Sequence, residues 1–186
     1  MRFPDRLFRV HAPALADRPP FLPDVQAARA GDRAAYARLH ARWHPVVHGL
    51  LIARLPAEDA EDLVQEVFVT AWLRLPDLAD AAAFPGWICA IARNRAADHG
   101  RARRPVLRLV EEPSASDPDP VALREILAAI HGLPDAYRET LALRLVEGLS
   151  GPEIAERTGL TEGSVRVNLF RGMALLRERL AAGGLP

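Results

Sequence analysis

Apolar residues recur at every third or fourth position through most of the chain. This spacing holds from residue 24 to about 104 and again from 121 to about 180, and neither stretch shows the alternation typical of strands or hairpins. The pattern predicts an all-α protein with two small helical domains, residues 24–104 and 121–186. Residues 1–23 contain five prolines and no periodic pattern, so we expect a flexible N-terminal extension there.

The two helical stretches are separated by residues 105–120, PVLRLVEEPSASDPDP. This segment holds four prolines, two serines and four acidic residues. Such a composition neither continues a helix nor buries much apolar surface. We therefore expect a flexible, acidic, proline-rich linker between the domains.

The first domain contains an apolar stripe that follows an acidic stretch. Residues 58–66 carry five acids and no base, as suits the start of a helix. The stripe comprises Leu63, Val64, Val67, Phe68, Ala71, Trp72 and Leu75, and we expect it to face the core. Asp62, Gln65 and Glu66 lie at positions i, i+3 and i+4, so they share another face of the helix. By spacing alone, this face is either a partner-binding surface or a solvated acidic surface.

A second helix of the first domain is predicted to begin near Phe84, because the proline that follows suits a first helical turn. Five arginines and a single acid lie between residues 93 and 104. Arginines near a helix C-terminus are favoured by the helix dipole, which could explain the last three of them; contact with phosphates is the functional alternative. The candidate nucleic-acid contacts are Arg93, Asn94, Arg101, Arg103 and Arg104.

The second domain carries the pattern of a helix-turn-helix. Ser150 and Glu153 have capping-box spacing and predict a helix start, Gly159 predicts a turn, and Thr161 is a suitable N-cap for a helix from 162 to about 180. In such motifs the N-terminal half of the second helix enters the DNA major groove, although two packed helices of other function can share the pattern. The predicted reading face comprises Ser164, Arg166, Val167, Phe170 and Arg171.

Composition narrows the functional classes. All 24 basic residues are arginines, so enzymes that need a P-loop, Schiff-base or nucleophile-activating lysine are excluded. The single cysteine, Cys89, cannot form an internal disulfide.

No apolar run reaches membrane-spanning length and the N-terminus does not resemble a signal peptide, so we expect a cytoplasmic protein. The formal net charge is zero, but the charges are separated into acidic and basic segments.

Several segments together resemble the extracytoplasmic-function (ECF) sigma factors of the sigma-70 family. Residues 59–72, DAEDLVQEVFVTAW, are similar to the polymerase-binding helix of that family, and residues 84–98 are similar to the helix that follows it. Residues 133–139, 147–156 and 163–171 resemble its promoter-reading C-terminal domain. The order and spacing of these segments match over residues 24–180.

The resemblance implies a non-enzymatic subunit of RNA polymerase without cofactors, bound metal or a small-molecule substrate. Asp62, Gln65 and Glu66 would bind the clamp of the bacterial core polymerase. Residues 24–104 would recognise and melt the minus-ten element of promoter DNA, with the loop 78–84 beside the candidate arginines. Residues 121–186 would recognise the minus-thirty-five element. An anti-sigma factor is a further implied partner.

Two departures from the family pattern concern promoter sequence. Val167 and Asn168 stand where many members have a polar residue followed by arginine, which removes one phosphate contact. Residues 81–83 are all alanine and give the loop few polar groups with which to hold a base. The promoter sequence of other members is therefore not transferable to this chain.

Two other functions compete with this interpretation. A transcriptional regulator that is not a polymerase subunit could carry the same helix-turn-helix, but it would need a receiver or ligand-binding domain, which residues 24–104 do not resemble. A His-rich metal-binding helical protein is the second alternative, because His40, His44 and His48 would share one helix face if the helix continued through Pro45. The proline argues against a continuous helix.

Overall fold

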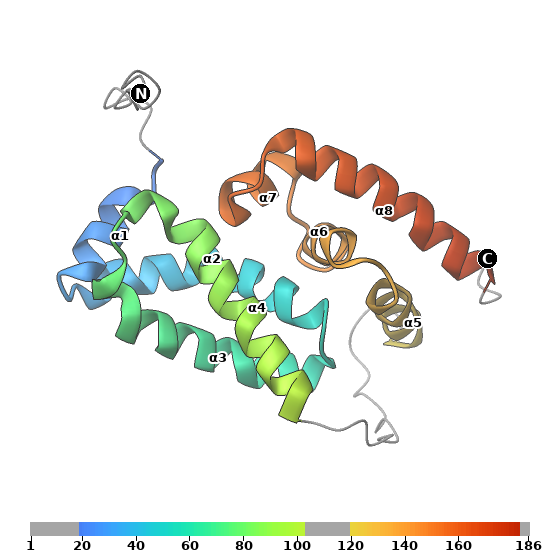
Figure 1. The fold of residues 1–186 in the computed structure, drawn as a ribbon, viewed down its shortest axis with the longest axis horizontal. Coiled ribbons are helices and arrows are strands. Elements are labelled where there is room, and N and C mark those ends of the chain that lie inside the picture. The colour runs from blue at the N-terminus through green and yellow to red at the C-terminus, as the bar shows by residue number, and fades with distance from the viewer. Residues whose placement is uncertain (1–18, 103–119, 183–186) are drawn as a thin grey trace, which may run out of the picture.

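The computed structural model describes residues 19–102 and 120–182, and all regular elements in these ranges are helical. The first group comprises α1 (Leu22–Arg29), α2 (Arg33–Ile52), α3 (Ala57–Arg74), the 3₁₀ turns η2 (Leu75–Asp77) and η3 (Ala81–Ala83), and α4 (Phe84–Ala102). The second group comprises α5 (Pro120–His131), α6 (Asp135–Leu145), α7 (Gly151–Thr158) and α8 (Glu162–Ala182). The expected all-α class with two helical domains is confirmed (Figure 1).

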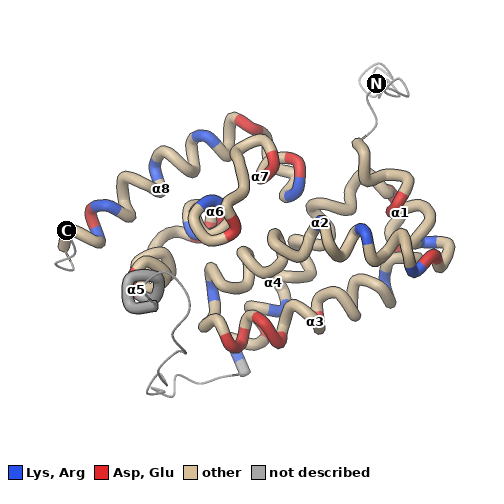
Figure 2. Tube along the Cα trace, turned by 180° about the vertical axis from the view of Figure 1, so that it is seen from behind, with Lys and Arg blue, Asp and Glu red and all other residues tan. Residues whose placement is uncertain are grey.

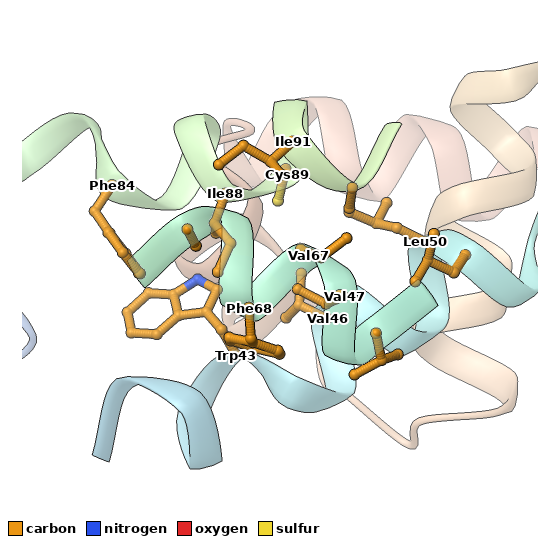
Figure 3. Packing of buried hydrophobic residues seen from close by; sticks show 14 of the residues in the cluster. Trp43, Val46, Val47, Leu50, Val67, Phe68, Phe84, Ile88, Cys89 and Ile91 are labelled. Atoms are coloured by element: carbon orange, nitrogen blue, oxygen red, sulfur yellow. The ribbon is translucent and has the colours of Figure 1, made fainter. Parts of the chain in front are cut away.

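The core of the first domain is built around Trp43 of α2. Its ring is fully buried and meets Phe84 edge to face, with ring centroids 4.9 Å apart (Figure 3). Phe21 also meets the ring edge to face, at a centroid distance of 5.2 Å. The contact includes Phe21 in the core, and α1 begins directly after it at Leu22, two residues before the expected domain boundary. Residues 1–18 of the predicted extension and residues 103–119 of the predicted linker lie outside the described residues.

The apolar stripe predicted from Leu63 to Leu75 is buried, except for Trp72, which is half-buried. Leu63, Val64, Val67, Phe68 and Ala71 are buried on the side of α3 that packs against α2 and α4, whereas Asp62 and Glu66 remain exposed. The helix therefore separates a core face from a solvent face.

The α2 helix continues through Pro45, contrary to the expectation that the proline opposes a continuous helix. His40, His44 and His48 consequently follow one another along one side, with ring centroids 5.5 and 6.3 Å apart. Trp43, Val46 and Val47, which lie beside Pro45, are fully buried, and this packing offsets the hydrogen bond that the proline cannot donate. In residues 19–102 and 120–182, no group of three histidine, cysteine or acidic side chains lies close enough to hold a metal ion.

The helix-turn-helix forms where the capping residues predict it. Ser150 and Glu153 make a capping box, in which the Ser150 N–H donates to Glu153 Oε2 at 2.9 Å. Gly159 ends α7 with φ of 77°, a left-handed conformation that suits glycine. Val165 of α8 is buried, and a Cβ at Gly151, the first residue of α7, would lie 3.9 Å from its Cγ1.

The two domains pack directly against each other. The larger apolar cluster begins in α1 to α4 and includes Leu143, Leu149 and Ile154 of the second domain. Gly49 of α2 allows this close approach, since a Cβ there would lie 2.7 Å from Leu143 Cδ2. A smaller cluster around Ile130, Leu133, Leu141 and Leu176 belongs to the second domain alone. None of the described helices has both the length and the apolar character needed to cross a bilayer.

Candidate protein and nucleic-acid interfaces

The solvent face of α3 combines acidic, polar and apolar side chains. Asp62, Gln65 and Glu66 are all exposed, as their spacing predicts. Val69 and Leu73 extend the same face by further steps of three or four residues, and they are 59% and 69% exposed. Exposed large apolar residues beside acids are typical of protein-binding surfaces. These two residues are not among the contacts predicted from the sequence, although their helical spacing from Glu66 places them on the same face.

The candidate nucleic-acid residues of α4 differ in their surroundings. Asn94 and Arg101 are exposed, and Arg101 pairs with Asp98 one turn earlier. Arg93 is half-buried and donates two hydrogen bonds, both 2.8 Å long, to the carboxylate of Glu139 in the second domain. These bonds raise the pKa of the Arg93 guanidinium above its usual value. The other two candidates, Arg103 and Arg104, lie outside the described residues.

Glu139 also binds a second arginine of the first domain. Arg54 Nη1 donates to Glu139 Oε1 at 2.5 Å, and Arg54 Nη2 lies 3.2 Å from Asp135 Oδ2. No motif or periodic pattern around Arg54 indicates a function in the sequence. It lies just beyond the end of α2, where the two domains meet.

The loop before α4 is compact. Leu78 and Ala81 are buried, and the Asp80 carboxylate accepts a hydrogen bond of 2.9 Å from the Ala82 N–H. This bond caps the 3₁₀ turn η3 and fixes the entry into α4. The loop presents two exposed alanines, Ala82 and Ala83, rather than polar side chains.

The predicted reading face of α8 is accessible. Ser164, Arg166, Val167, Phe170 and Arg171 are all exposed, and Figure 2 shows basic residues spaced along this helix. Phe170 is 79% exposed, the highest value among the large apolar residues that remain at the described surface. The Thr161 hydroxyl accepts a hydrogen bond of 3.1 Å from the Ser164 N–H and thus caps the start of the helix.

These features define a two-domain helical DNA-binding protein. Its second domain presents a capped helix-turn-helix with arginine and apolar side chains at the start of the second helix, which is the arrangement that major-groove readers use. Its first domain presents the mixed acidic and apolar face of α3, which suits a protein partner.

Comparison with known proteins identifies the family. Residues 39–106 match the family model described as sigma-70 region 2, and residues 123–176 match sigma-70, region 4. The chain is 31% identical to the ECF RNA polymerase sigma factor SigF of Caulobacter vibrioides over 157 residues, covering 81% of this chain and 88% of the relative. It is 30% identical to the ECF RNA polymerase sigma-E factor of Escherichia coli K12 over 175 residues, covering 84% and 92%.

A solved structure is similar over nearly its whole length. The chain of CnrH, determined in complex with the cytosolic domain of CnrY, matches with a TM-score of 0.58 and 28% identity, covering 87% of this chain and 97% of CnrH. The protein belongs to the ECF sigma factors of the sigma-70 family. It therefore directs transcription initiation by binding core RNA polymerase and by recognising and melting promoter DNA.

Proposed function

We propose that the sigma-factor functions are divided among three surfaces of this chain. The acidic face of α3 binds core polymerase, α4 with the loop before it binds the minus-ten element, and the start of α8 binds the minus-thirty-five element. The observation that carries this division is the separation of charge and exposure: acids and apolar residues lie on α3, and exposed arginines lie on α8 (Figure 2).

The polymerase surface is formed by Asp62, Gln65 and Glu66, with Val69 and Leu73 as its apolar extension. The acids would pair with arginines of the polymerase clamp, and the apolar residues would lose water on docking. Exposed ion pairs contribute little in isolation, so the apolar extension supplies affinity while the charges supply orientation.

The promoter surface of the second domain is formed by the start of α8. Arg166 and Arg171 reach guanine edges or phosphates, Phe170 and Val167 contact thymine methyl groups, and Ser164 contacts the backbone. In the first domain, Arg93, Asn94 and Arg101 with Arg103 and Arg104 contact DNA at the minus-ten element. Strand opening there costs a few kcal/mol per unstacked base step, which contacts with the polymerase and DNA offset.

We further propose a cytoplasmic protein that catalyses no reaction itself and that is controlled by an inhibitory protein partner, an anti-sigma factor. The complex of the similar chain CnrH with the cytosolic domain of CnrY supports a protein partner of this kind. The acidic and apolar face of α3 is accessible to such a partner as well as to the polymerase.

Two pairs of substitutions test the division. Asp62→Arg with Glu66→Arg should abolish co-purification with core polymerase, because both replacements place like charges against the arginines of the clamp. Arg166→Ala with Arg171→Ala should leave polymerase binding intact and weaken promoter binding by the assembled complex. Equal effects of the two pairs in both assays would refute the proposed division.

A matched control is available for the charge reversal. Glu125 on α5 and Glu178 near the end of α8 are exposed and belong to none of the three surfaces, so Glu125→Arg with Glu178→Arg changes the net charge by the same amount. This control should co-purify with polymerase like the wild type. Loss of binding in the control would show that net charge, and not the α3 face, governs the interaction.

A further inference from the structure

The ion pairs between the two domains all have the same polarity. The first domain supplies the cation and the second the anion in each described case, with nitrogen-to-oxygen distances from 2.5 to 3.2 Å. The pairs are Arg42 with Glu156, His48 with Glu147, Arg54 with Asp135 and Glu139, and Arg93 with Glu139. The domains thus meet through complementary surfaces and not only through apolar contacts.

Glu139 lies at the centre of this interface. Its side chain is only 10% exposed, and its carboxylate accepts hydrogen bonds from two guanidinium groups, those of Arg54 and Arg93. Within the second domain no described side chain pairs with it, so its burial serves the contact between domains. Two convergent arginines form a site for an oxyanion, and a phosphate would fit the same donors. Glu139 therefore occupies the donors that Arg93 would offer to DNA.

The closed arrangement also conflicts with simultaneous binding of both promoter elements. The positions that name the minus-ten and minus-thirty-five elements differ by about 25 base pairs, which is about 85 Å along B-form DNA at 3.4 Å per base pair. In the structure, by contrast, a Cβ at Gly159 of the turn would lie 3.6 Å from the Gly86 nitrogen at the start of α4. Domains in such contact cannot reach both elements, so they must separate before the promoter is engaged.

We propose that this arrangement is an autoinhibited state of the free chain and that Glu139 is its latch. Closure withholds Arg54 and Arg93 from nucleic acid, and opening exposes them together as a phosphate-binding pair. The inference adds regulation to the proposed promoter surface of α4 and rests on that proposal for its consequence in DNA binding. The existence of the latch itself does not depend on it.

Cys89 provides a native probe of opening. It precedes Arg93 by one helical turn, its Sγ lies 3.7 Å from the Arg157 carbonyl oxygen of α7, and it is fully buried. Burial raises the pKa of its thiol to about 12, so the closed protein should react slowly with a thiol reagent. Because Cys89 is the only cysteine in the sequence, the reaction reports a single site.

Two substitutions should open the interface by different means. Glu139→Gln removes the charge that both arginines bind while preserving the shape of the side chain. Gly49→Leu introduces a side chain where even a Cβ would lie 2.7 Å from Leu143 Cδ2 and 3.0 Å from Glu147 Cγ. Both contacts come from the other domain, so the opened protein should tolerate leucine, which is also a better helix former than glycine.

Each variant has a matched control. Glu178→Gln removes an exposed carboxylate from the same domain as Glu139, and Gly100→Leu enlarges a helical glycine whose Cβ would meet nothing within 4 Å. Circular dichroism and thermal unfolding of all variants verify that both domains remain folded. The reaction rate of Cys89 is then measured for each full-length protein.

We expect Glu139→Gln and Gly49→Leu to raise the reaction rate of Cys89 about tenfold or more. The first variant loses the ion pairs with the two arginines, and the second loses the packed contact with Leu143. Both controls should react like the wild type. Affinity of the free chain for DNA should rise in the same two variants. A wild-type rate for Glu139→Gln would overturn the latch, as would a wild-type chain that reacts as fast as its urea-unfolded form. Faster thiol reaction without stronger DNA binding would retain the latch and refute the promoter role of Arg93.

Discussion

Substitution of Phe170 should weaken promoter binding without lowering the stability of the fold. Its side chain is 79% exposed on α8 and makes no described core contact, so Phe170→Ala should change the free energy of unfolding by no more than about 0.5 kcal/mol. A phenylalanine of about 200 Å² would leave about 160 Å² to be buried, an upper limit of about 4 kcal/mol at 25 cal/mol per Å². One groove wall covers less than half of this surface, which leaves about 1–2 kcal/mol.

The expected result is therefore a loss of about 5- to 30-fold in promoter affinity without a change in thermal stability. The assay is fluorescence anisotropy of the polymerase complex on duplexes selected from random sequence by the wild-type protein. Leu145→Ala is the control, since Leu145 is an apolar residue of the same domain that is 44% exposed but lies on α6. Unchanged affinity for Phe170→Ala, or an equal loss for Leu145→Ala, would refute the assignment of the reading face.

Two further predictions concern the contact between domains and the helix-turn-helix. The hydrogen bond to Glu147 raises the pKa of His48 above its usual 6.5, with Glu61 contributing. The ion pair therefore contributes its full stabilisation below about pH 6.5, and this contribution is lost as the pH rises through the higher pKa of the folded state. His48→Gln should flatten this part of the pH profile of thermal unfolding. An unaltered profile would contradict the assignment. Ser150→Ala removes the capping box and should cost about 1 kcal/mol in urea unfolding, whereas no loss would show that the Glu153 bond alone suffices.

Local signals in the sequence predicted most of the helical architecture. The capping pair of Ser150 and Glu153, the turn at Gly159 and the apolar stripe of α3 each act within a few residues, so spacing alone locates them. The same signals placed the exposed candidates on α3 and α8. These positions depend on helix geometry, which is regular once a helix is assigned.

The contact between domains could not be predicted in this way. Gly49 and Arg54 have no distinctive local pattern, and their importance arises from Leu143 and Glu139, which lie more than eighty residues away. Likewise, the sequence indicated that Arg93 could bind an anion but not that a carboxylate of the same chain occupies it. The continuity of α2 through Pro45 also depends on tertiary packing, which outweighs the local cost of the proline.

The most direct test of the sigma-factor assignment is open-complex formation by core RNA polymerase with the purified chain. Permanganate reactivity of unpaired thymines is measured on a promoter selected by the wild-type complex. The account predicts melting near minus ten only when the chain is present, its loss with Asp62→Arg and Glu66→Arg, and a reduction with Arg166→Ala and Arg171→Ala at limiting protein. Melting that is independent of the chain, or polymerase that never opens DNA in its presence, would contradict it.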